Sequence, residues 1–167
     1  FFQDSGSITF NEQESPAEIL KAVLERNHLS SIVRNIFPRT AHHPKVGIVT
    51  CMDSRLHTEE LVGDTRGYYY VLRTAGSAID LKEIEMLELA ISNGVQLVLF
   101  TTHSDCAAEK AANSDELKSK FPELTKAVLQ RDQRYTQFLE RPDISSKIAS
   151  GQLIVKRVNV DTLGGGA

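Results

Sequence analysis

The chain has 167 residues, 41% of them hydrophobic and 25% charged, with ten glycines and five prolines. This balance is typical of one ordinary folded domain and excludes a collagen, a low-complexity linker and a disordered tail. Nineteen Lys and Arg stand against 22 Asp and Glu, which gives a formal net charge of -3. Because no global positive field attracts nucleic acid or anionic lipid, we expect no nucleic-acid partner.

The apolar runs and the cysteines indicate the environment in which the chain works. The longest apolar stretches, such as residues 95–100, are far shorter than the roughly 20 residues that span a bilayer, so we expect a soluble protein with no membrane partner. Two cysteines do not form a disulfide scaffold, and they indicate a reducing compartment. We expect the cytoplasm, or an organelle matrix if a targeting peptide has been trimmed from the chain, which begins at Phe1 without Met.

The first predicted element is a helix that begins after a polar arm, residues 3–13. Ser15 can cap the helix, Pro16 suits its first position, and Glu18 completes a capping box. An apolar stripe at helical spacing follows, formed by Ile19, Leu20, Val23 and Leu24. We assign residues 1–35 to this N-terminal arm and helix.

Three short runs of apolar and β-branched residues predict buried strands, at residues 46–50, 69–72 and 95–100. Between the second and third runs, residues 80–93 have apolar side chains at helical spacing, and Gly94 follows as a C-cap. A strand, a helix and a parallel strand form a βαβ unit.

The last third of the sequence predicts helices and one final strand. A long polar helical region extends from residues 113–115 to Leu139, with a break near Pro122, and residues 153–160 form the strand. We therefore predict an α/β fold with three layers, α/β/α, and a mainly parallel central sheet. The whole chain, residues 1–167, is expected to be a single domain whose sheet core and metal site occupy residues 45–167.

Two polar clusters follow two of the predicted strands. Cys51 comes directly after the first strand, and His103 and Cys106 follow the third. Ligands of open parallel sheets bind beyond the carboxyl ends of the strands, so these side chains converge if the two strands are neighbours. Two thiolates and an imidazole are ligands that zinc favours, and three protein ligands leave a position open for water, as in catalytic sites. The alternative is that both cysteines are small buried hydrophobic residues.

Asp53 and Arg55 favour the catalytic alternative. Two residues apart in an extended segment, they are expected to point the same way as Cys51. Two thiolates offset the charge of Zn²⁺, so a nearby carboxylate is needed to accept a hydrogen bond from the bound water. Arg55 is expected to hold Asp53 through a bidentate fork, away from the metal. A surface ion pair is the alternative interpretation.

These motifs resemble those of the β-class carbonic anhydrases. The family signature is Cys-x-Asp-x-Arg after the first core strand and His-x-x-Cys after a later one, and residues 51–55 and 103–106 match it. Residues 71–76 are similar to the Val-x-Arg-Asn-Ala-Gly stretch of the family, and the likeness extends over residues 46–112.

The resemblance implies a function and a set of roles. Cys51, His103 and Cys106 are implied to bind one Zn²⁺ per chain, and Asp53 and Arg55 to form the catalytic dyad. The implied enzyme is a zinc lyase that hydrates carbon dioxide to bicarbonate by zinc-bound hydroxide. It also implies a homodimer or a dimer of dimers, with the N-terminal helix packed on the partner.

Two departures from the family pattern leave the substrate open. Thr74 stands where the family usually has Asn, and Ala107 where it usually has Gly. Together with Ala75 and Gly76, they are the expected neighbours of a compact apolar substrate pocket. The alternative function is therefore hydrolysis of carbonyl sulfide or carbon disulfide, and a noncatalytic zinc-stabilised binding protein is a third. His42, His43 and His57 are candidate proton relays, with exposed loop histidines as the alternative.

Overall fold

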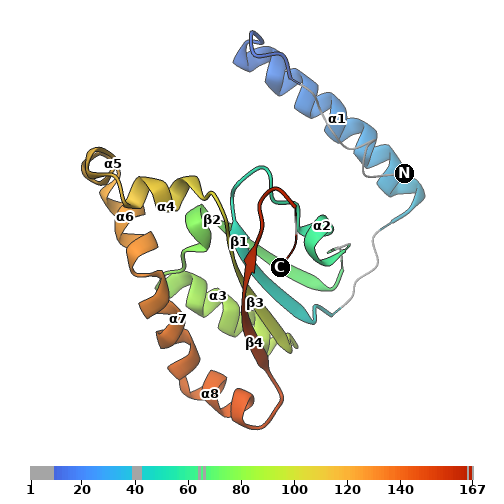
Figure 1. Cartoon of the computed structure of the whole chain (residues 1–167). Coiled ribbons are helices and arrows are strands. Elements are labelled where there is room, and N and C mark those ends of the chain that lie inside the picture. Colours follow the sequence, from blue (N-terminus) through green and yellow to red (C-terminus); the bar gives the residue numbers. More distant parts are fainter. Residues whose placement is uncertain (1–9, 39–42, 64, 66, 165, 167) are drawn as a thin grey trace. The chain divides into compact units, whose positions relative to one another are not determined.

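The computed structural model describes residues 10–38, 43–63, 65, 67–164 and 166 (Figure 1). The chain divides into two compact units, Phe1–Ala41 and His42–Ala167. No helix in the described ranges has the length and apolar character required to cross a membrane.

The described residues of the first unit form helix α1 (Pro16–Ile36). Ser15 is its N-cap and accepts a hydrogen bond from the Glu18 N–H, while the Glu18 side chain accepts from the Ser15 N–H, so the predicted capping box is confirmed. None of its side chains is buried. Residues 3–9 of the predicted polar arm lie outside the described residues.

The second unit is built on a parallel sheet with the strand order β2-β1-β3-β4. The strands are β1 (Val46–Cys51), β2 (Tyr69–Thr74), β3 (Leu97–His103) and β4 (Ile154–Val160). The predicted α/β class with a parallel sheet is confirmed. Because β1 pairs with both β2 and β3, the two polar clusters that follow β1 and β3 come from neighbouring strands.

Three helices, α3 (Leu81–Ser92), α7 (Arg131–Glu140) and α8 (Pro142–Ala149), contribute to the main core, and Figure 1 shows them along one side of the sheet. The core contains Val49, Val98 and Phe100 from the strands together with Leu87 and Phe138 from the helices. Side chains alternate between the two faces of a strand, so these strand residues share one face. This core fixes the strands whose ends carry the candidate site.

The other helices are short and lie between the strands in sequence. They are α2 (Thr58–Val62), the 3₁₀ turn η2 (Ala75–Ser77), α4 (Ala107–Ala112), α5 (Asp115–Lys120) and α6 (Pro122–Leu129). The predicted break at Pro122 is confirmed, and a second break occurs at Gln130, between α6 and α7. Helices α2, α4 and α8 were not predicted, because five to eight residues are too few to show a helical period.

Candidate metal centre

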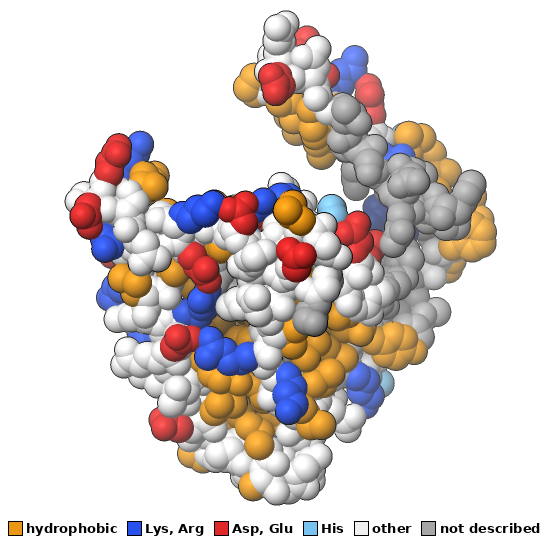
Figure 2. Space-filling model, viewed as in Figure 1, with side chains coloured by type: hydrophobic (Ala, Val, Ile, Leu, Met, Phe, Trp, Pro, Cys, Tyr) orange, Lys and Arg blue, Asp and Glu red, His pale blue; other side chains and the backbone are white. Residues whose placement is uncertain are grey.

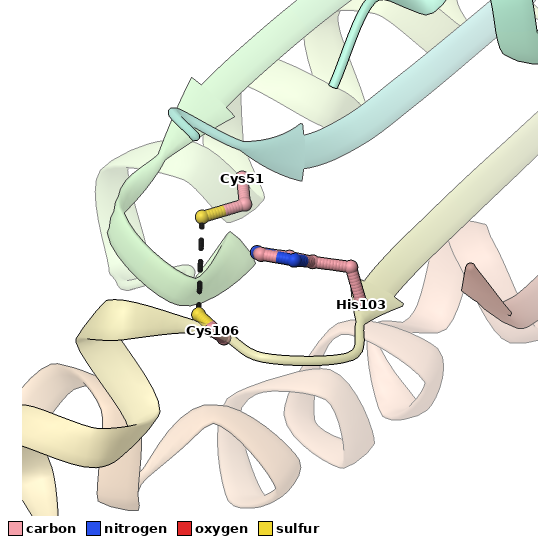
Figure 3. Close-up of side chains that lie close together, drawn as sticks. All are labelled: Cys51, His103 and Cys106. Atoms are coloured by element: carbon pink, nitrogen blue, oxygen red, sulfur yellow. Dashed lines mark hydrogen bonds between the residues drawn. The ribbon is translucent and has the colours of Figure 1, made fainter. Parts of the chain in front are cut away.

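Cys51, His103 and Cys106 converge beyond the carboxyl ends of β1 and β3. Cys51 ends β1, His103 ends β3, and Cys106 is the N-cap residue of α4. Their ligand atoms all lie within 4.8 Å of one another, and the two Sγ atoms are 4.0 Å apart. Figure 3 shows the three side chains directed toward a common point. All three residues are at most 4% exposed, so this group is enclosed by the protein.

The hydrogen bonds of His103 leave one ring nitrogen for a metal. Nδ1 lies 2.9 Å from the Ser104 carbonyl oxygen and 2.9 Å from Thr162 Oγ1. Nε2 is buried and has no hydrogen-bond partner in the described part of the chain. A proton on Nδ1 leaves the Nε2 lone pair facing the sulfur atoms, which is the tautomer of a metal-binding histidine. The donor set, two sulfurs and one imidazole nitrogen, fits a zinc ion.

The two thiols experience different local interactions. Burial, followed by the nearby Cys51 sulfur, raises the pKa of Cys106 above its ordinary value. Cys51 Sγ accepts a hydrogen bond from the Gly76 N–H at 3.3 Å. A divalent cation held by these residues would stabilise the Cys106 thiolate against the cost of burial.

Asp53 and Arg55 form the predicted pair beside the cluster. Arg55 donates from Nε to Asp53 Oδ1 at 3.0 Å and from Nη2 to Asp53 Oδ2 at 2.7 Å, a bidentate fork. These side-chain hydrogen bonds, and a further one from the Arg55 backbone N–H, hold the pKa of the Asp53 carboxyl well below its usual range. The catalytic role of the pair stays a prediction.

The prediction of an extended segment at residues 51–55 is wrong. Ser54 and Arg55 lie in a turn, and the Arg55 N–H donates to Asp53 Oδ1 at 2.9 Å. An Asp side chain readily accepts from the backbone amide two residues later, and this local bond favours a turn over a strand. The turn, and not the alternation of side chains along a strand, brings the Asp53 and Arg55 side chains together.

Asp105 and Lys110 extend this pair into a larger charged cluster that the sequence analysis missed. Arg55 Nη1 contacts Asp105 Oδ2 at 2.9 Å, and Lys110 also binds the Asp105 carboxylate. These contacts, first with Lys110 and then with Arg55, lower the pKa of Asp105. Asp105 could have been predicted from its position inside His-x-x-Cys, because a residue between two metal ligands in the sequence must lie near the site.

Arg73 and Thr162 are two further supports outside the Cys-x-Asp-x-Arg and His-x-x-Cys motifs, and the likeness of residues 71–76 to the family gave Arg73 no role. Arg73 donates to the Cys51 carbonyl oxygen at 3.1 Å and to the Asp53 carbonyl oxygen at 2.7 Å. Thr162 follows β4, whose pairing with β3 matches Val160 with His103 and so brings Thr162 to the imidazole. Only the strand order reveals either contact.

The expected substrate-pocket residues lie at different depths. Gly76 is buried, Thr74 and Ala75 are half-buried, and Ala107 is exposed. The Thr74 hydroxyl donates to the Ala78 carbonyl oxygen at 2.7 Å, so its hydrogen atom is already engaged. Their role as substrate neighbours stays a prediction.

A cavity of about 240 Å³ lies beside the charged pair. It is lined by Arg55, Leu56, His57, Glu60, Leu61, Thr162, Leu163 and Gly164. His57 therefore borders a space next to Arg55, whereas His42 lies outside the described residues. A relay function of the histidines stays a prediction.

Comparison with known proteins identifies the family. A family model described as carbonic anhydrase matches residues 46–162, which include both motifs and nearly the whole sheet unit. The chain belongs to the carbonic anhydrase family. This chain is 28% identical over 138 residues to a curated carbonic anhydrase of Helicobacter pylori (strain J99 / ATCC 700824). That match covers 72% of this chain and 60% of the relative, so the chain spans about 60% of the length of that protein.

Solved structures show the same fold. The β-carbonic anhydrase CcaA superposes with a TM-score of 0.71 at 20% identity, over 90% of this chain and 93% of that one. One of two tetrameric β-carbonic anhydrases from Sordaria macrospora gives a TM-score of 0.65 at 19% identity, covering 89% and 94%. An apo carbon disulfide hydrolase superposes with a TM-score of 0.53 at 15% identity, over 90% of this chain and 89% of that one. The β-carbonic anhydrase resemblance seen in the sequence is therefore confirmed.

Proposed function

We propose that this protein is a zinc enzyme that hydrates carbon dioxide to bicarbonate. The observation that carries the proposal is the buried cluster of Cys51, His103 and Cys106, whose unpartnered Nε2 faces two sulfur atoms. An ion pair of the type expected for catalysis, Asp53–Arg55, stands next to it. Membership of the carbonic anhydrase family supports the same reaction.

Cys51, His103 and Cys106 would hold the zinc ion, and its fourth position would stay open. When bound there, zinc supplies a Lewis acid that lowers the pKa of a water molecule. Asp53 would accept a hydrogen bond on the open side of the site. Because its pKa is held low, Asp53 stays ionised at neutral pH and serves as an acceptor and not as an acid.

Arg55 would keep Asp53 away from the metal. A carboxylate near a divalent cation is strongly attracted to it, and the bidentate fork opposes this attraction. The contact of Arg55 with Asp105 fixes the guanidinium from its other side. The charged cluster would thus preserve the open position on which turnover depends.

Hydrolysis of carbonyl sulfide or carbon disulfide is the second candidate function. It is favoured by Thr74 and Ala107, which depart from the family pattern where the substrate is expected. A structural relative is named a carbon disulfide hydrolase, and its likeness concerns the fold. A noncatalytic binding protein is disfavoured, because it would not need the buried metal cluster and the Asp53–Arg55 pair together.

Turnover of both substrates by one zinc-loaded preparation tests the proposal. Carbon dioxide hydration is followed by stopped-flow proton release, and carbonyl sulfide hydrolysis by sulfide release, with a Cys106→Ser protein as the inactive control. We expect the higher kcat/KM with carbon dioxide. A higher value with carbonyl sulfide would assign the second function, and no turnover of either would reject both.

We further propose that the protein works as a homodimer or a dimer of dimers. Helix α1 has no buried side chain, and hydrophobic residues form much of its surface in Figure 2. On the sheet unit, Val71 and Ile154 are also exposed, at 38% and 53%. Apolar surface of this extent is typical of protein interfaces. We propose a reducing compartment, the cytoplasm or an organelle matrix, for a protein that depends on free thiols.

A further inference from the structure

The backbone of Gly76 connects the candidate metal centre to a helix that is distant in sequence. The Gly76 N–H donates to Cys51 Sγ at 3.3 Å, and the Gly76 carbonyl oxygen accepts from Arg131 Nη1 at 2.6 Å. Arg131 is the first residue of α7. One residue thus receives a side-chain hydrogen bond on its carbonyl and gives a hydrogen bond to a candidate metal ligand.

The conformation of this segment requires support from its surroundings. Gly76 has φ of +63° and the next residue, Ser77, has φ of +55°, so two consecutive residues occupy the left-handed region. Glycine adopts this region without strain, but a non-Gly residue such as Ser77 persists there only where neighbouring groups hold the backbone. In the described part of the chain, Arg131 is the side chain that binds the Gly76 carbonyl oxygen.

Arg131 is itself anchored and largely enclosed. Its side chain is 19% exposed, and Nη2 contacts Glu109 Oε1 at 2.8 Å. Glu109 lies in α4, three residues after Cys106. A Cβ atom at Gly76 would lie 3.3 Å from Ala108 and Val128 side-chain atoms, so the segment is also tightly enclosed. The guanidinium therefore bridges the helix that begins at one sulfur ligand and the turn that binds the other.

We propose that Arg131 is a positioning residue of the metal centre: oriented by Glu109, it fixes the Gly76 backbone so that the Gly76 N–H stays on Cys51 Sγ. A hydrogen bond donated to a metal-bound thiolate withdraws electron density from sulfur and tunes the metal. Two thiolates offset most of the charge of a divalent cation, so this withdrawal preserves its Lewis acidity. The inference rests on the proposed function only in requiring that the three ligands bind a metal.

Cobalt(II) substituted for zinc tests this role without a measurement of turnover. Arg131→Met removes both hydrogen bonds of the guanidinium but keeps much of its volume. We expect the sulfur-to-cobalt charge-transfer band to move to longer wavelength, because a thiolate that has lost its hydrogen bond releases an electron more easily. In competition with a chelator, affinity for zinc should fall by about tenfold or more.

Arg134→Met is the matched control. Arg134 lies one turn later in α7, its side chain is 20% exposed, and it pairs with Asp80 at 3.0 Å rather than with Gly76. We expect the wild-type band in this variant and a partial return toward it in Arg131→Lys, which keeps the charge and a donor. If Arg131→Met does not fold, Glu109→Gln is the variant that tests the proposal. We expect its charge-transfer band to move in the same direction by a smaller amount.

The proposal is overturned if the charge-transfer band of Arg131→Met, or of Glu109→Gln where Arg131→Met does not fold, stays at the wild-type wavelength. It is also overturned if the band of Arg134→Met moves by the same amount. The outcome is separable from that of the proposed function. A protein that shows the shift but hydrates no carbon dioxide rejects the function and keeps the role of Arg131. A protein that hydrates carbon dioxide but shows no shift rejects the role of Arg131 and keeps the proposed function.

Discussion

His103 presents Nε2 to the two sulfur atoms because its other ring nitrogen is engaged. Nδ1 faces the Ser104 carbonyl oxygen and the Thr162 hydroxyl, and this hydroxyl also donates to the Ser104 carbonyl. The ring orientation is therefore set by residues on two strand ends. Supports of this kind fix the tautomer of a metal ligand and raise its affinity for the metal.

Thr162→Val should weaken zinc binding while leaving all three ligands in place. It removes one acceptor of Nδ1, and loss of such a support typically reduces metal affinity by about 10- to 100-fold. Chelator competition measures the change. Thr162→Ser keeps the hydroxyl and should bind zinc nearly as the wild type does. Equal affinities of the Val and Ser variants would show that Thr162 does not support the ligand.

Arg55→Ala should abolish most activity and retain zinc. Without the fork, the Asp53 carboxylate is free to become the fourth ligand, because a bare anion beside Zn²⁺ is strongly attracted to it. Turnover should fall by orders of magnitude at unchanged zinc content. X-ray absorption should show a carboxylate, recognised by scattering from its carbon, in place of the water oxygen.

The double variant Arg55→Ala, Asp53→Ala identifies the source of that ligand. Arg55 also contacts Asp105, so its removal leaves a second carboxylate nearby that Lys110 alone still holds. If Asp53 is the new ligand, the double variant should lose the carboxylate signal and regain a water oxygen at the metal. Near-normal turnover of the single Arg55→Ala protein would instead reduce Arg55 to a structural ion-pair partner.

Among single residues, those within the two motifs were predictable and their supports were not. The sequence predicts Cys51, His103 and Cys106 as a cluster, because the ends of adjacent parallel strands bring such residues together. Thr162 and Arg131 reach the site from segments distant in the sequence. Their contacts depend on strand order and helix packing, which no local pattern encodes.

At the scale of elements, the strands and the longer helices were predictable for physical reasons. Helices α1 and α3 carry caps and apolar spacing, and β1 is a buried β-branched run. The third strand was expected at residues 95–100 and lies at Leu97–His103. The end of this strand contains the polar residues Thr101 and His103, which are buried at the site. The prediction relied on apolar residues and therefore ended the strand too early.

The turn η2 should be more sensitive to a methyl group than an open turn. Gly151→Ala adds a Cβ at φ of +76° with nothing within 4 Å, so it should lose about 1–2 kcal/mol of unfolding free energy through backbone strain. Gly76→Ala adds contacts at 3.3 Å in a tightly packed space, which should cost about 1–3 kcal/mol more. Urea unfolding of the metal-free proteins measures both. Equal losses would contradict the packing described for this turn.

For the whole molecule, the apolar surface of α1 predicts assembly. Leu20, Val23 and Leu24 are between 43% and 58% exposed, and hydrophobic area of this kind is stabilised when another protein surface covers it. We expect sedimentation velocity to show dimers or larger assemblies, and Leu24→Glu to shift them toward monomers. Lys21→Glu places the same charge on the same helix at an already polar position and should leave assembly unchanged. A monomeric wild-type protein would refute the proposed homo-oligomer.

The central claim is that this chain hydrates carbon dioxide at a single zinc site formed by Cys51, His103 and Cys106. Titration of metal-free protein with zinc, with the stopped-flow hydration rate recorded at each addition, tests it most directly. We predict that the rate rises linearly and saturates at one zinc per chain, and that Cys106→Ser neither retains zinc nor gains activity. A hydration rate that does not depend on added zinc, or full zinc occupancy in Cys106→Ser, would contradict the claim.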